Sequence, residues 1–148
     1  MESKLFSPIS IGDLTINNRV VVAPMCQYSA VNGSATDWHL MHLGQFSVSG
    51  CGLVFVEATA VEEKGRITPG CLGIYSDANE SALLKILRFF RKYGSSKVGI
   101  QLAHAGRKAS TAVPWLGGLP LEKGNQGKWD TVGPTSHPYA SNWPQPIQ

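Results

Sequence analysis

The chain has 148 residues, which is enough for one domain with its own hydrophobic core. A hydrophobic content of 43% and a charged content of 16% are typical of a soluble globular protein and exclude a disordered chain. The net charge of +3 would suit an anionic small molecule, and the lack of any basic run excludes nucleic acid as an expected partner.

The sequence also predicts a location. No apolar run approaches the ~18 residues of a membrane span, so no membrane partner is expected. The N-terminal stretch MESKLFSPISIG lacks the basic and apolar regions of a secretory signal. The cysteines at positions 26, 51 and 71 form no CxxC pair and leave an odd thiol. These features predict a reducing, cytoplasmic environment.

The first elements are short. Residues 5–17 are predicted to form a β-hairpin of two alternating strands around a Gly-Asp turn. Residues 19–25, RVVVAPM, predict a first core strand that is buried on both faces and stopped by its proline. Residues 37–50 predict a helix, with Asp37 as the N-cap and Gly50 near the C-terminus.

The clearest helix covers residues 76–94. Ser76 or Asp77 can cap its N-terminus, and Gly94 ends it. Apolar residues recur with i, i+3, i+4, i+7 spacing and predict one buried face: Leu83, Ile86, Leu87 and Phe90. This helix separates two further apolar segments that we predict to be buried strands.

These two strands cover residues 52–61 and 97–106. The resulting β-α-β-α-β order predicts an α/β fold with a parallel sheet. All three strands end in polar side chains, and parallel α/β folds keep their active sites at the carboxyl ends of the strands. The polar residues after the three strands are therefore expected to line one shared site.

Residues 107–148 differ in composition. Six of the nine prolines, three of the four tryptophans and five glycines fall there, without sustained periodicity. A loop of this length in a compact domain is usually functional or disordered. The tryptophans favour a packed lid or substrate loop. We therefore divide the chain into residues 1–106, a barrel portion, and residues 107–148, a substrate or lid loop.

Four segments in order carry a family resemblance: APMCQY, EATAV, GRITPGCLGIYSD and QLAHAGRKAS. With them, roughly three quarters of the chain resembles the old yellow enzyme family, specifically its bacterial xenobiotic-reductase-like class of FMN-dependent ene-reductases. The resemblance implies a (β/α)₈ TIM barrel that holds FMN non-covalently at the carboxyl ends of its strands. A complete barrel needs on the order of 250 residues, so this chain is expected to supply an N-terminal portion.

The resemblance also implies roles for individual residues. Cys26 would tune the flavin through a hydrogen bond, although a small buried hydrophobe is the alternative for such a thiol. The amide of Gln101 matches the donor and acceptor edge of the flavin, and burial without a partner would be costly. Tyr28 would face the substrate, and Glu57 is expected to be structural. The full set of expected cofactor-binding residues is Ala23, Pro24, Met25, Cys26, Ala58 and Gln101.

Other polar groups carry weaker expectations. Arg107 and Lys108, after His104, could contact a phosphate or NADPH, or form a solvated basic loop. His39, His42 and Cys51 are too few and too widely spaced for a zinc site, so no metal is expected.

The resemblance predicts an NAD(P)H-dependent FMN oxidoreductase that reduces activated alkenes such as enones, with NADPH favoured over NADH. No catalytic residue is assigned within this chain, because the family's substrate-binding His pair, its proton-donating tyrosine and its phosphate loop have no counterpart here. The alternatives are a non-catalytic half-barrel that assembles with another chain or binds flavin weakly, and a flavin-free scaffold. The full-length protein could also form a homo-oligomer.

Overall fold

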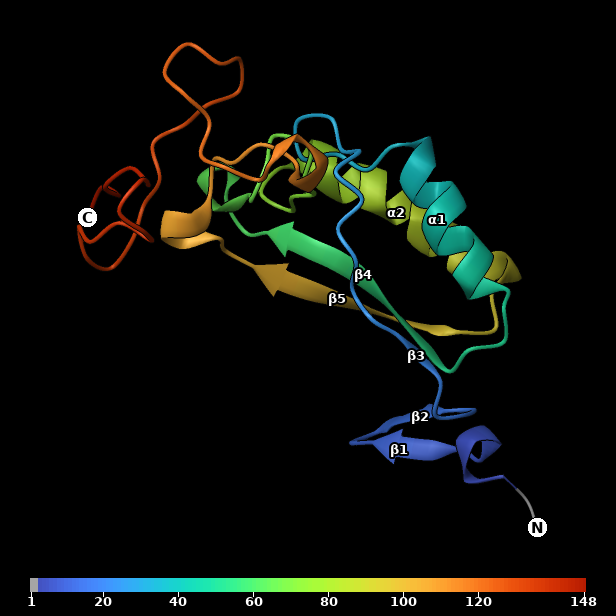
Figure 1. Cartoon of the computed structure of the whole chain (residues 1–148). Helices are drawn as coiled ribbons and strands as arrows, with labels where there is room; N and C mark the ends of the chain where they lie inside the picture. Colours follow the sequence, from blue (N-terminus) through green and yellow to red (C-terminus); the bar gives the residue numbers. More distant parts are fainter. Residues whose placement is uncertain (1–2) are drawn as a thin grey trace.

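A three-stranded parallel sheet organises the chain in the computed structural model, which describes residues 3–148. The strands are β3 (Val21–Val22), β4 (Leu53–Ala60) and β5 (Lys97–Ala103), in that order across the sheet. Helices α1 (Asp37–Ser47) and α2 (Asp77–Tyr93) lie together on one face of the sheet (Figure 1). This is the predicted β-α-β-α-β order with parallel pairing.

The predicted hairpin is also present. Strands β1 (Ile9–Ile11) and β2 (Leu14–Ile16) pair antiparallel, with Ile9 opposite Ile16. The turn between them contains Gly12 at a φ of 57°, a left-handed conformation that glycine adopts without steric cost. The hairpin lies beyond the amino end of the sheet, away from the polar strand ends (Figure 1).

The core lies between β4 and the two helices. β4 is buried along nearly all its length because it alone has a strand on each side among the described residues. Its apolar side chains meet the stripe of α2 in one cluster, made of Leu43, Cys51, Val54, Val56, Leu72, Leu83, Ile86 and Phe90. Ser76 caps α2 by accepting a hydrogen bond from the backbone N–H of Asn79 at 3.2 Å, and Gly94 follows its last turn, both as predicted.

Two strand predictions were wrong in their burial. The segment 19–25 contributes only two residues to the ladder, and Val21 is 46% exposed. β5 is also partly exposed to solvent: Leu102 is 62% exposed, and Gln101 is exposed. Both are edge strands in the part of the chain that the structure covers, so neither has a second neighbour to cover it.

The start of α1 also differs from the prediction. Thr36, not Asp37, is the N-cap residue, and Asp37 is the first residue of the helix. The backbone N–H of Thr36 donates to Nδ1 of His39 at 3.0 Å, which satisfies one of the free groups at the helix start. The helix ends at Ser47, three residues before Gly50.

The C-terminal segment 107–148 lies over the carboxyl ends of β4 and β5 (Figure 1). It is held there by hydrogen bonds to the segment between β4 and α2. The indole Nε1 of Trp129 donates to the Lys64 carbonyl at 2.9 Å, and the backbone N–H of Thr111 donates to the Ile67 carbonyl at 2.9 Å. Within residues 3–148, no helix is both long and apolar enough to cross a membrane.

Candidate cofactor site at the strand ends

The three strand ends form one row. Ala58 on β4 and Gln101 on β5 are direct partners in the parallel ladder, after a bulge between Val56 and Ala58. Cys26 follows β3, on the other side of β4, and the backbone of Ala58 is close enough to act on the pKa of its thiol in the lowering direction. The structure therefore brings Cys26, Ala58 and Gln101, which lie far apart in the sequence, side by side at the carboxyl edge of the sheet.

Most of the predicted cofactor-binding side chains are accessible at this edge. Ala23 and Gln101 are exposed, and Met25 is 45% exposed. Pro24, Cys26 and Ala58 are half-buried. Within residues 3–148, the side-chain amide of Gln101 forms no hydrogen bond, so its donors and acceptor are free for a ligand. The sequence analysis expected a free-energy cost if this amide were buried without a partner. Because Gln101 is exposed, there is no such cost.

A buried carboxylate fixes the segment that carries Cys26. Glu57, on β4, is 3% exposed, and its Oε2 accepts a hydrogen bond from the backbone N–H of Gln27 at 3.2 Å. Its Oε1 lies 3.3 Å from Nε2 of the buried His39, out of line for a hydrogen bond. Nδ1 of this histidine accepts from Thr36, so Nε2 carries the proton that faces the carboxylate. Glu57 thus ties the 25–28 segment and α1 to the sheet.

The backbone at Tyr28 is unusual. Its φ is 53°, which is rare for a residue with a large side chain and indicates strain that neighbouring contacts must support. Gly70 provides that support. A Cβ added at Gly70 would lie 2.5 Å from the carbonyl oxygen of Tyr28, and the Gly70 carbonyl accepts the backbone N–H of Ala30 at 2.9 Å.

Tyr28 lines a cavity of about 490 Å³ between the strand ends and the C-terminal segment. Its ring also meets the Trp115 ring edge-on, with centroids 5.4 Å apart. Burial raises the pKa of the Tyr28 phenol above its ordinary value of 10.0, so this hydroxyl is protonated at neutral pH. The other lining residues include Ile67, Thr68, Lys108, Pro114 and Trp143.

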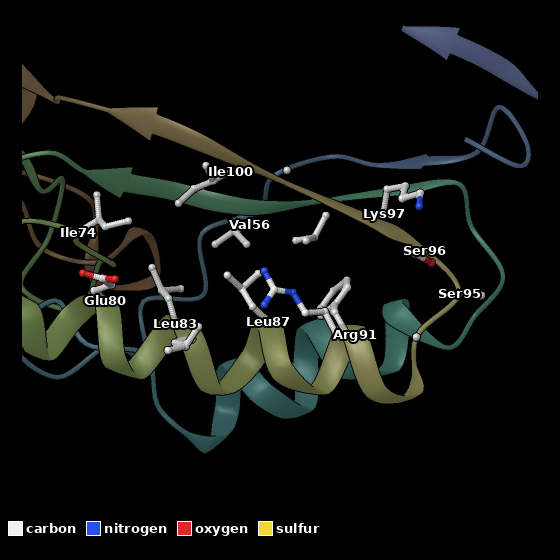
Figure 2. Close-up of a pocket in the computed structure, with 15 residues that line it drawn as sticks. Val56, Ile74, Glu80, Leu83, Leu87, Arg91, Ser95, Ser96, Lys97 and Ile100 are labelled. Carbon is white, nitrogen blue, oxygen red and sulfur yellow. The ribbon is translucent and has the colours of Figure 1, made fainter. Parts of the chain in front are cut away.

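A larger cavity, of about 610 Å³, lies elsewhere. It is a mainly apolar space between α2 and β5, lined by residues such as Val56, Leu83, Leu87 and Ile100 (Figure 2). Glu80 and Arg91 also line it, and its lining contains neither a thiol nor a histidine. This cavity marks the open side of β5 and does not contain the predicted site.

The basic residues after β5 are engaged with the protein. Nε2 of His104 lies 2.7 Å from Oε1 of Glu62. The Arg107 guanidinium donates to the His137 carbonyl at 3.4 Å, and the Lys108 ammonium lies 4.8 Å from the Tyr139 ring centroid. Both side chains are nevertheless exposed, as a phosphate contact or a solvated basic loop would require.

A second thiol belongs to this edge and was missed from the sequence. Cys71 is 1% exposed and comes from the loop before α2, and its interaction with Cys26 raises the pKa of the Cys26 thiol. The same interaction lowers the pKa of Cys71 to about 6, with a further contribution from Thr68, whose Oγ1 lies 3.3 Å from Sγ of Cys71. No periodicity or short-range spacing could have revealed a contact between residues so far apart.

Metal binding finds no support among residues 3–148, since no three His, Cys, Asp or Glu side chains gather there.

The sequence analysis also missed the buried His39–Glu57 pair, although the sequence contains a signal for it. A carboxylate inside the apolar run LVFVEATA is rarely buried unless a partner satisfies it.

Relatives of known name share the sequence of this region. An NADH:flavin oxidoreductase from Gibberella zeae is 49% identical over 127 residues, which are 86% of this chain and 30% of the relative. An NADPH dehydrogenase from Bacillus subtilis is 47% identical over 111 residues, 74% of this chain and 32% of the relative. The chain therefore spans about a third of the length of these curated relatives.

Solved structures share the fold. Morphinone reductase superposes with a TM-score of 0.75 at 20% identity, over 97% of this chain and 39% of that protein. Old Yellow Enzyme from Pichia sp. AKU4542 gives 0.75 at 24% identity, over 98% and 38%. The predicted (β/α)₈ barrel portion is thereby confirmed.

Residues 4–120, most of the chain, match the model of one family. Its description, the identity to named relatives and the barrel fold agree with the resemblance found in the sequence motifs. The chain belongs to the NADH:flavin oxidoreductase / NADH oxidase family.

Proposed function

We propose that this chain forms the N-terminal part of an FMN-dependent NAD(P)H oxidoreductase that reduces activated C=C bonds, such as those of enones. The observation that carries the proposal is the row of Cys26, Ala58 and Gln101 at the carboxyl ends of adjacent parallel strands. This is the edge at which parallel α/β folds bind their ligands. NADPH is the preferred reductant in this proposal, in keeping with the names of relatives such as the Bacillus subtilis enzyme.

The residues at this edge fit FMN. A flat ring needs small side chains beneath it, and Ala23 and Ala58 supply them. It also needs a polar partner for its pyrimidine edge, and the Gln101 amide has free donors and a free acceptor. Met25 offers an accessible apolar surface at the same edge. When bound there, FMN would supply hydride transfer between the nicotinamide and the alkene.

The chain's own residues would position the reactants. Gln101 would orient the ring through its amide, and Pro24 with Met25 would exclude water from one side. Tyr28 would contribute to the substrate cavity, where its protonated phenol can donate a hydrogen bond to the carbonyl of an enone. The segment 107–148 would close this cavity from above, with Trp115 against Tyr28.

The three cysteines support a cytoplasmic location for this function. All three are free thiols, which a reducing compartment preserves. We assign the active protein to that compartment on this ground.

The test is flavin reduction by NADPH without oxygen. The chain is mixed with FMN and then with a second polypeptide that carries the remaining strands of the Bacillus subtilis NADPH dehydrogenase. The proposal predicts bleaching of the visible flavin absorbance that needs both polypeptides and slows in Gln101→Ala. Bleaching no faster than that of free FMN would contradict it, and would favour the non-catalytic half-barrel.

A further inference from the structure

The cavity beside Tyr28 has two polar residues whose side chains are free to bind a ligand. This cavity, of about 490 Å³, is lined by Tyr28 and by Lys108, which follows β5. Among residues 3–148, the Tyr28 hydroxyl forms no hydrogen bond, and the Lys108 ammonium forms neither a hydrogen bond nor an ion pair. A molecule in this cavity would therefore meet one hydroxyl group and one positive charge.

The rest of the cavity lining is apolar or already satisfied. Oγ1 of Thr111 donates to the Ile67 carbonyl at 3.1 Å, and Oγ1 of Thr68 accepts the Gly70 N–H at 3.2 Å. Lys108 is the one charged residue of the lining, which is drawn from residues 3–148 and contains no Asp or Glu. Such a cavity suits a mainly apolar molecule with one hydrogen-bond acceptor and one negative charge.

The C-terminal segment holds the Lys108 ammonium in place. Its Nζ lies 4.8 Å from the centroid of the Tyr139 ring, within the range of a cation–π contact. The Tyr139 ring packs against the Trp143 ring with centroids 4.9 Å apart, and Trp143 lines the cavity itself. Because this contact restricts the lysine before any ligand arrives, less side-chain entropy is lost when an anion binds.

The neighbouring arginine has a different environment. The Arg107 guanidinium donates to the His137 carbonyl at 3.4 Å, and Arg107 does not line the cavity. Arg107 and Lys108 are both exposed and both positively charged. Arg107 is therefore a matched control, since it has the same charge one residue away but no part in the cavity.

We propose that this cavity binds alkenes that carry a carboxylate in addition to the activating carbonyl, such as γ-keto-α,β-unsaturated acids. The Tyr28 hydroxyl would donate to the carbonyl, and the Lys108 ammonium would pair with the carboxylate. The net charge of +3 would also attract an anionic substrate. This inference rests on the proposed function, which makes the cavity a substrate site, and adds the class of substrate.

The test uses a keto acid and its uncharged ester, β-benzoylpropionate and methyl β-benzoylpropionate. Neither contains an alkene, so neither can alkylate the thiols of the chain. Both keep the carbonyl and an apolar ring, and they differ in charge. Titration calorimetry with the purified chain, at low salt, measures the dissociation constants of both ligands for the wild type, Lys108→Met, Lys108→Arg and Arg107→Met.

We expect the wild type to bind the acid about fivefold more tightly than the ester, which is the size of effect that one exposed ion pair produces. Lys108→Met should bind acid and ester equally, whereas Lys108→Arg and Arg107→Met should keep the preference. A rise in salt to about 0.5 M should reduce the preference of the wild type, because salt screens exposed charges. This last measurement tests the ion pair without any substitution.

Equal affinity for acid and ester in the wild type would overturn the proposal, and so would a preference that survives in Lys108→Met or does not respond to salt. Failure of both ligands to bind the wild type, shown to be folded by circular dichroism, would overturn it as well. The flavin-bleaching test of the proposed function contains no alkene, so the two results are independent. Bleaching without a preference for the acid would refute the substrate class alone.

Discussion

Removal of the Glu57 carboxylate should destabilise the chain more than any surface change. In Glu57→Ala, the backbone N–H of Gln27 loses its hydrogen-bond acceptor, and Nε2 of His39 loses the carboxylate oxygen that lies 3.3 Å away. Each buried polar group left without a partner costs about 1–3 kcal/mol. Because Gln27 is only half-buried, we take the lower half of that range for it. The expected loss in the free energy of unfolding is about 3 kcal/mol.

Glu57→Gln removes the negative charge of the side chain and keeps its shape. Its side-chain oxygen can still accept the hydrogen bond from the Gln27 N–H, and only the charge beside His39 is lost, so the expected loss is about 1 kcal/mol. Glu122→Gln and Glu122→Ala are matched controls, since Glu122 is exposed and its side chain forms no hydrogen bond within residues 3–148. These controls should stay within about 0.5 kcal/mol of the wild type.

Urea unfolding followed by tryptophan fluorescence measures these differences. With a slope of about 2 kcal/mol per molar urea, the midpoint should fall by about 1.5 M in Glu57→Ala and by about 0.5 M in Glu57→Gln. A double-mutant cycle with His39→Ala should show coupling between the two positions. A Glu57→Ala midpoint equal to that of Glu122→Ala would refute the structural role of this carboxylate.

Three further predictions follow from single contacts. Ser76→Ala removes the cap of α2 and should lower the free energy of unfolding by about 1 kcal/mol, measured by thermal circular dichroism against Ser141→Ala, an exposed control. The low pKa of Cys71 gives a thiolate that ultraviolet absorbance should detect near pH 6, and Cys71→Ser should abolish this step. Since this pKa lies below the ordinary value of 9.0, the contribution of Cys71 to stability should grow as the pH rises from about 6 to 9 and vanish as it falls through 6. Trp115→Ala removes the edge contact to Tyr28 and should cost about 0.5–1.5 kcal/mol in urea unfolding, whereas an unchanged midpoint would show that the contact does not hold the loop.

Local patterns predicted the elements that depend on neighbouring residues in the sequence. Helix α2 has an apolar stripe, a capping serine and a terminal glycine, and the structure has both ends where the sequence places them. The hairpin follows from alternation around Gly12 in the same way. Parallel pairing of the three strands followed from their order, because strands separated by helices cannot pair as hairpins.

Features that depend on distant contacts could not be predicted. The exposure of Gln101 and Val21 depends on which strands flank β5 and β3, and apolar composition alone does not specify that. The effect of Cys71 on the pKa of Cys26 depends on how two segments far apart in the sequence are placed. Thr36 displaced Asp37 as the N-cap because both residues can cap a helix and their order leaves the choice to the tertiary structure. For the candidate site, the sequence motifs led to Cys26, Ala58 and Gln101, and the structure added the ladder that pairs Ala58 with Gln101.

The most direct test of the account is an FMN titration of the purified chain, followed by quenching of flavin fluorescence. We expect saturable binding that weakens by about tenfold in Gln101→Ala, because the loss of two hydrogen bonds removes about 1.4 kcal/mol. The same substitution at Gln126, an exposed residue of the C-terminal segment, should leave the affinity unchanged. Equal quenching in wild type and Gln101→Ala, or none from the folded chain, would contradict a cofactor site at these strand ends.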